Sequence, residues 1–231
     1  MRNLRILAAL GLVTVAGMAQ AEVTGTAAIV SDYDFRGFTQ TNNDATLQGS
    51  IDYSHESGWY IGTWASGVDF GSPKPSTEVD VYTGFSSSVG DLGWDVGINY
   101  YGYPGASDLE FAEIYGKLSY KMVSGGVYYS DDFGGSSESG IYVYGDVEIP
   151  IGDLSLTLHA GLSDGDGVGA TYFSDGEGGT IEDSYTDYGV GLSYTLSNFT
   201  FGLKWVGLDA GDAGSDDRVI LSFSTSLPWG E

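Results

Sequence analysis

One basic residue lies among carboxylates near the start of the chain. In the stretch Asp-Tyr-Asp-Phe-Arg-Gly, Asp32, Asp34 and Arg36 are spaced two residues apart. Alternate residues of a strand share a face, so the guanidinium and both carboxylates would point the same way. Such a group can pair internally, fix a loop or narrow a pore, and a structural ion pair at a strand end is the simplest interpretation. Gly37 follows as a residue that tolerates positive φ where a strand turns over.

A second set of charged residues lies on the polar faces of alternating segments. In residues 92–101, for example, every second residue is apolar, and Asp95 lies among the residues between them. The same parity in the other segments predicts a lumen lined by eight carboxylates and four basic side chains: Asp52, Asp69, Asp80, Asp95, Glu113, Asp146, Glu148 and Asp187, with Lys117, Lys121, Lys204 and Arg218.

This charge pattern leaves two alternatives open. An excess of carboxylates around an open pore favours cations. The charges can instead pair across the lumen and plug it. Pairing is favoured for Glu113, Lys117 and Lys121, which share one face of one segment.

An acidic, glycine-rich segment raises the question of calcium. Asp164 and Asp166, and further along Asp175 and Glu177, alternate with other residues, mostly glycine. Carboxylates at such positions can wrap a hard cation, but the spacing of a helix–loop–helix calcium site is absent. We therefore expect a solvated loop that binds cations weakly, and no cofactor.

Residues for catalysis are scarce. The chain has no cysteine and two histidines, His55 and His159. His159 lies on a polar face among serines and a threonine, yet serine attack needs an oriented base and a third group. There is also no Cys/His metal set and no phosphate-binding glycine loop at a strand–helix junction. The sequence therefore predicts that the protein is not an enzyme.

The elements that carry these residues are predicted to be strands. Each shows apolar and polar residues in alternation, and no proline-rich or charged linker divides them, so we expect one domain. The twelve predicted strands are 23–35, 46–54, 59–70, 78–89, 92–101, 110–121, 124–130, 140–149, 154–163, 187–196, 199–208 and 219–227. Aromatic residues near their ends could form interfacial belts: Trp59, Phe70, Trp94, Phe111, Tyr188, Phe199, Trp205 and Trp229.

The connections between the predicted strands alternate in length. Those at 54–58, 90–91, 122–123, 152–153 and 197–198 are tight, whereas those at 71–77, 102–109, 131–139, 164–183 and 209–217 are longer and mostly acidic. Antiparallel strands that cross a membrane have tight turns on one side and long loops on the other. A soluble sandwich also alternates apolar and polar residues, but it has less reason to sort its loops.

The first 21 residues have the features of a secretory signal peptide. Arg2 and Arg5 precede the apolar run 6–15, and Ala19-Gln20-Ala21 is a small-x-small cleavage site. We expect cleavage before Glu22, which leaves 22–231 as the barrel domain. No later segment reaches the roughly 20 apolar residues of a membrane helix, and in lipid only a closed barrel satisfies a sheet. The net charge of −24 excludes nucleic acid as a partner.

Residues 31–40 carry a resemblance to a known family. Their sequence, SDYDFRGFTQ, resembles the opening motif S-D-Y-x-F-R-G-x-[ST]-Q of the proteobacterial TorF-type porin family. A Q-G strand at 48–53 and a G-x-Y-x-G-x-W-x-S strand at 58–66 follow, as in that family. The resemblance implies an outer-membrane barrel of porin function, with no established substrate or cofactor. The motif residues are Ser31, Asp32, Tyr33, Phe35, Arg36, Gly37 and Gln40.

Together these features predict an all-β protein, an up-and-down antiparallel transmembrane barrel of about twelve strands in the lipid of the outer membrane. We expect passive diffusion of small polar solutes with a preference for cations. The alternative is a plugged or narrow structural barrel whose acidic loops are bridged to lipopolysaccharide by divalent cations. A third interpretation is a soluble periplasmic β-protein that binds a ligand. The residues indicate neither a particular solute nor an oligomeric state.

Overall fold

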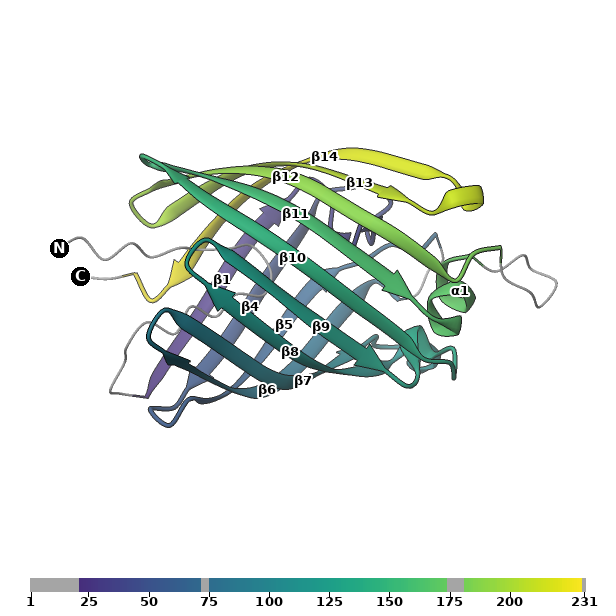
Figure 1. Ribbon diagram of the computed structural model, residues 1–231, viewed down its shortest axis with the longest axis horizontal. Helices are drawn as coiled ribbons and strands as arrows, with labels where there is room; N and C mark the ends of the chain where they lie inside the picture. The colour runs from purple at the N-terminus through teal and green to yellow at the C-terminus, as the bar shows by residue number, and fades with distance from the viewer. Residues whose placement is uncertain (1–20, 72–74, 174–180, 230–231) are drawn as a thin grey trace.

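Twelve antiparallel strands close into a barrel in the computed structural model, which describes residues 21–71, 75–173 and 181–229 (Figure 1). Each strand pairs with its neighbours in sequence, and β1 pairs with both β4 and β14, so the sheet has no open edge. The predicted fold class is therefore confirmed. The strands are β1 (Glu22–Val30), β4 (Thr46–Ser54), β5 (Trp59–Gly67), β6 (Thr77–Val89), β7 (Leu92–Gly102), β8 (Phe111–Tyr120), β9 (Val123–Ser130), β10 (Gly140–Ile151), β11 (Leu154–Asp164), β12 (Ser184–Leu196), β13 (Phe199–Asp209) and β14 (Ser215–Leu227).

The two ends of the barrel differ. At one end, which we call the turn end, tight turns join the strands, β1 begins and β14 ends. The other end, the loop end, holds the short helices η1 (Ser107–Leu109), η2 (Phe133–Gly135), α1 (Asp166–Tyr172) and η3 (Gly211–Ala213) (Figure 1). No helix in the described part of the chain is long and apolar enough to cross a membrane. The signal-peptide prediction concerns residues outside the described ranges, apart from Ala21.

The first predicted strand, 23–35, is wrong in its second half. β1 ends at Val30, and the chain then forms a small hairpin of β2 (Asp34–Phe35) and β3 (Phe38–Thr39) before β4 begins. The turn occurs because Arg36 and Gly37 both take positive φ, at 50° and 89°. We call residues 31–45 the first-loop hairpin.

The outer surface of the barrel is apolar. Leu158 on β11, Val190 on β12 and Leu203 on β13 are 40%, 41% and 47% exposed. The residues next to each of them along its own strand point inward. Aromatic pairs such as Phe85–Trp94 near the turn end and Tyr188–Trp205 near the loop end lie on this surface. A surface this apolar indicates contact with a membrane or a partner.

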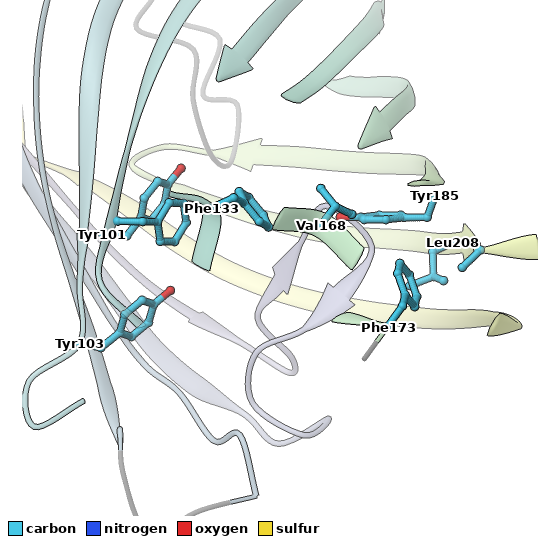
Figure 2. Packing of buried hydrophobic residues seen from close by; sticks show 9 residues of the cluster. Tyr101, Tyr103, Phe133, Val168, Phe173, Tyr185 and Leu208 are labelled. Atoms are coloured by element: carbon cyan, nitrogen blue, oxygen red, sulfur yellow. The ribbon is translucent and has the colours of Figure 1, made fainter. Parts of the chain in front are cut away.

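The hydrophobic core lies inside the barrel, at the loop end. Side chains from β7, β8, β12 and β13 meet side chains from η2 and α1 there (Figure 2). Phe111 belongs to this cluster and not to an exterior belt, because β8 directs it inward, where it is 7% exposed. The buried residues of the cluster are Tyr101, Tyr103, Phe111, Phe133, Val168, Phe173, Tyr185, Leu208 and Ala210.

The two faces of β11 give the first prediction. In lipid vesicles we expect Leu158→Arg to lower the free energy of unfolding by about 2–4 kcal/mol, because it places a charge on the lipid side near the middle of the strand. Thr157→Arg should cost much less, because Thr157 points into the lumen. Urea unfolding of both refolded variants measures the difference, and equal penalties would show that the outer face does not meet lipid.

Candidate functional site in the lumen

The first-loop hairpin places its tip, the turn residues Arg36 and Gly37, inside the barrel. Phe35 pairs with Phe38 across a two-residue turn formed by Arg36 and Gly37, whose positive φ values are typical of a type I′ turn. Glycine adopts this conformation freely, but arginine does so at a cost of about 1–3 kcal/mol. A Cβ atom on Gly37 would lie 3.0 Å from the Cβ atoms of Asp187 and Leu208, so the tip is seated tightly against β12 and β13.

Aromatic contacts join the hairpin to opposite sides of the barrel wall. The ring of Tyr33 lies 5.2 Å from that of Trp64 on β5, and its hydroxyl donates to Glu78 on β6 at 2.9 Å. Phe38 packs at 5.0 Å from Tyr185 on β12 and stacks at 4.1 Å on Tyr172 of α1. The hairpin therefore spans the lumen, and it does not simply line one side of it.

A buried ion pair fixes the tip. One guanidinium nitrogen of Arg36 lies 2.6 Å from Oε2 of Glu113 on β8, and the hydroxyl of Tyr101 donates to the same oxygen at 2.8 Å. Both charged side chains are almost fully buried, at 7% and 1% exposed. Burial lowers the pKa of Arg36, but the nearby Glu113 carboxylate raises it by more than burial lowers it. The pKa therefore lies above its ordinary value, and the guanidinium stays charged.

Two further cations hold the arm of the hairpin, by which we mean residues 31–35. Arg218 on β14 donates to Asp32 and Asp34 at 2.8 Å each, and to Asp216 at 2.6 Å. Lys204 on β13 donates to Asp34 at 3.0 Å. The two aspartates therefore pair with the barrel wall and not with Arg36, because the positive-φ turn carries the guanidinium away from them.

The remaining inward carboxylates have varied partners. Asp95 lies 3.9 Å from Lys117, and Asp146 and Asp187 contact the two ring nitrogens of His159 at 2.7 and 2.8 Å. Some of the predicted lumenal charge is thus matched by basic groups on neighbouring strands.

Three other predicted carboxylates lie beside neutral groups. Asp52 accepts hydrogen bonds from Tyr82 and from Ser50, the latter at 2.7 Å, and Glu148 accepts from Ser155 at 2.7 Å. Asp80 is 6% exposed and lies 3.5 Å from the Asn99 amide.

Two of the predicted pore-lining residues lie outside the strands. β5 ends at Gly67, so Asp69 lies in the following loop, exposed, where it accepts from the backbone of Gly71. β8 ends at Tyr120, and Lys121 occupies the turn with φ of 56°. Both strands end earlier than the sequence predicts, because the alternation continues into the connections.

The predicted calcium loop is only partly described. Asp164 ends β11 and Asp166 begins α1, whereas Asp175 and Glu177 lie outside the described residues. Within 21–71, 75–173 and 181–229, no group of three or more His, Asp or Glu side chains is placed to hold a metal ion.

Sequence reasoning missed the tyrosines of the lumen. Tyr82, Tyr115 and Tyr144 share the inner faces of their strands with acidic residues already predicted there, so the same parity could have found them. Glu78, 1% exposed, follows from its spacing of two residues from Asp80. The interior therefore carries aromatic side chains among its acidic ones.

Comparison with known protein families identifies the family of this chain. Residues 15–222 match the profile of a family described as "Bacterial protein of unknown function (Gcw_chp)". The chain belongs to this family. The search of curated proteins found no match.

Solved porins share the fold. The structure titled "KdgM porin in complex with disordered oligogalacturonate" has a TM-score of 0.55 and 9% identity, covering 90% of this chain and 100% of that one. The NanC porin has a TM-score of 0.57 and 14% identity, with 88% of this chain and 99% of that one covered. The chain thus has a porin-like barrel fold.

The Arg36–Glu113 ion pair that holds the tip of the hairpin gives the second prediction. Glu113→Gln leaves Arg36 buried without a counter-charge, and breaking a buried pair in this way costs about 3–5 kcal/mol. We expect amide exchange in residues 34–39 to become at least about 10-fold faster, while the barrel strands keep their protection. Hydrogen exchange with mass spectrometry measures this effect.

Glu110→Gln is the matched control for that variant. Glu110 accepts a hydrogen bond from the hydroxyl of Tyr100 on the outer face of the barrel and does not contact the hairpin. The same acceleration in both variants would show that Glu113 does not hold the hairpin in place.

Proposed function

We propose that the protein is a porin-like channel of the outer membrane that passes small polar solutes, preferably cations, and that its first-loop hairpin closes the lumen at rest. One observation carries the proposal. Ion pairs, ring contacts and the Tyr33–Glu78 hydrogen bond join the hairpin to every strand from β5 to β10 and from β12 to β14. A segment in contact with so much of the circumference leaves little space for solutes to pass beside it.

The outer-membrane location is supported by the surface and by the closure of the sheet. The exterior is apolar along the strands, and a closed barrel leaves no unpaired backbone groups for lipid to face. We also propose that residues 1–21 are removed as a signal peptide and that 22–231 form the mature barrel. The resemblance of residues 31–40 to TorF-type porins agrees with this assignment.

The hairpin is suited to move because ion pairs contribute much of its attachment. The attraction in a buried ion pair is largely offset by the cost of removing both charges from water, so such pairs specify a position more than they add net stability. Arg36 also holds a strained backbone conformation that would relax once its side chain is released. The barrel strands, in contrast, are held by continuous hydrogen-bonded ladders.

The lumen on the turn side of the hairpin favours cations. Asp52 and Glu148 accept hydrogen bonds from hydroxyl groups, which leave their charges unbalanced. Rings of carboxylates attract cations and repel anions in a pore. Asp95 and Asp146, which have no basic residue on their own strands, are matched by Lys117 and His159 from neighbouring ones, and contribute less to this field.

The second candidate function is a permanently plugged barrel with a structural or surface role. The aromatic cluster at the loop end favours it, because Phe133 and Val168 are each 1% exposed and close that end by apolar packing. In this case divalent cations would bridge the acidic loops to lipopolysaccharide. Both candidates lack enzymatic activity in our proposal, since the ring nitrogens of His159 contact two aspartates and Tyr142 and no serine.

Single-channel recording of refolded protein tests the proposal. We expect the wild type to be closed most of the time, with brief openings, and Glu113→Gln to raise the open fraction at least about 10-fold, since 1.4 kcal/mol corresponds to a factor of ten. Glu110→Gln should behave like the wild type. A folded, inserted Glu113→Gln protein that stays silent would favour the plugged barrel. A steady wild-type current equal to that of a variant lacking 34–39 would show that the hairpin closes nothing.

Selectivity gives a further prediction. The Glu113→Gln channel should prefer potassium over chloride, and adding Asp52→Asn and Glu148→Gln should bring the reversal potential closer to zero. The preference should weaken with salt, because the Debye length falls from about 10 Å at 0.1 M to about 3 Å at 1 M. Glu56→Gln, which removes one charge from an exposed turn, serves as the control. Preference for chloride would contradict the proposed role of the lumenal carboxylates.

A further inference from the structure

We propose that the cage around Arg36 is a binding site for a guanidinium group, which the chain fills at rest with its own side chain and which a guanidinium-bearing solute can occupy instead. The inference rests on the proposed function and names the ligand class of the same site. In this account Arg36 is a tethered ligand, and a solute that replaces it promotes opening of the hairpin.

The cage consists of four aromatic rings and one carboxylate. The central carbon of the Arg36 guanidinium lies 4.3 Å from the ring centre of Tyr142, 4.7 Å from Phe35, 5.0 Å from Tyr128 and 5.9 Å from Phe133. Glu113 supplies the negative charge at 2.6 Å. Four of these five residues come from the barrel wall or from η2, and only Phe35 belongs to the hairpin, so most of the cage does not depend on the hairpin.

The chemistry of the cage favours guanidinium over other cations. A guanidinium is planar and weakly hydrated, and it stacks on aromatic faces while it donates a fork of hydrogen bonds to a carboxylate. An ammonium ion is a compact, strongly hydrated charge, so it loses more hydration free energy than a guanidinium on entering such a site. A cation over the face of an aromatic ring is attracted by the negative charge of the ring's face.

One acceptor in the cage is unused. Oε2 of Glu113 accepts from both Arg36 and Tyr101, whereas the buried Oε1 has no hydrogen-bond partner in the described structure. A buried carboxylate oxygen without a donor is costly. A free guanidinium, unrestrained by the strained backbone of Arg36, can turn to donate to both oxygens, as arginine–carboxylate pairs often do.

A tyrosine wall connects the cage with the rest of the lumen. The ring of Tyr144 lies 5.7 Å from that of Tyr142 and 6.3 Å from that of Tyr128. On the same wall, the Lys117 ammonium lies 4.4 Å from the ring of Tyr115 and 5.5 Å from that of Tyr128. The wall thus already holds a second cation against ring faces, and it offers a path from the lumen to the cage.

Arg36 has the advantage of its tether. A side chain held beside its site acts at an effective concentration of millimolar or more. A free solute should therefore bind weakly to the wild type and much more strongly when the cage is vacated. Arg36→Gly vacates it without disturbing the turn, because a Gly-Gly pair fits a type I′ hairpin.

Calorimetric titration of detergent-refolded protein with ethylguanidinium tests the inference. We expect Arg36→Gly to bind the probe at least about 10-fold more tightly than the wild type. Adding Glu113→Gln to Arg36→Gly should weaken binding at least about 10-fold again, whereas adding Glu110→Gln should leave it unchanged. Urea, which has the same shape without the charge, should not compete, and ethylammonium should compete weakly.

The outcomes separate this inference from the proposed function. Binding by Arg36→Gly that is absent, unaffected by Glu113→Gln or matched by urea would overturn the guanidinium site, whatever the conductance. Because the titration needs no current, binding as expected would support the site even in a barrel that never conducts. In bilayers, ethylguanidinium should raise the open fraction of the wild type severalfold but leave that of Arg36→Gly unchanged, and no rise in a conducting wild type would overturn competition with Arg36.

Discussion

The pairing of Arg36 with Glu113 is the interaction on which the position of the hairpin, and therefore the proposed closure of the lumen, depends. A guanidinium at the tip of a hairpin cannot remain inside a barrel without a counter-charge, and the carboxylate comes from β8, on the wall that the tip faces. With the tip fixed there, the arm lies against Arg218 and Lys204, and Phe38 reaches the cluster at the loop end. Release of the tip would remove the reason for the rest of the hairpin to stay inside.

Two kinds of interaction at the loop end have different energetic roles. Apolar packing among Phe111, Phe133, Val168 and Tyr185 contributes net stability, because it buries large side chains without leaving charges to balance. The ion pairs fix the position of the hairpin but add little net stability, because their attraction is offset by the cost of desolvating both charges. Because the wall is held by hydrogen-bonded ladders and ion pairs fix the position of the hairpin, the hairpin could move without unfolding the wall, as the channel proposal requires.

The sequence predicts the barrel better than it predicts the site. Alternation along segments such as 92–101 and 154–163 identifies strands and their inner faces, because a period of two is a local property. Residues 23–35 continue the alternation past Val30, so nothing local distinguishes the end of β1 from the hairpin that follows. The partner of Arg36 lies 77 residues away, and only closure of the barrel brings Glu113 to it. The parity that predicts Glu113 as lumenal therefore cannot indicate which charge it meets.

A disulfide between the hairpin and the wall tests the central claim most directly. The chain has no cysteine, and a Cβ atom on Gly37 would lie 3.0 Å from that of Leu208, within a small shift of the roughly 3.8 Å that a disulfide prefers. In single-channel recordings of the Gly37→Cys, Leu208→Cys protein, we expect silence when it is oxidised and openings after reduction. An unchanged current in the oxidised, cross-linked protein would show that solutes do not pass where the hairpin lies.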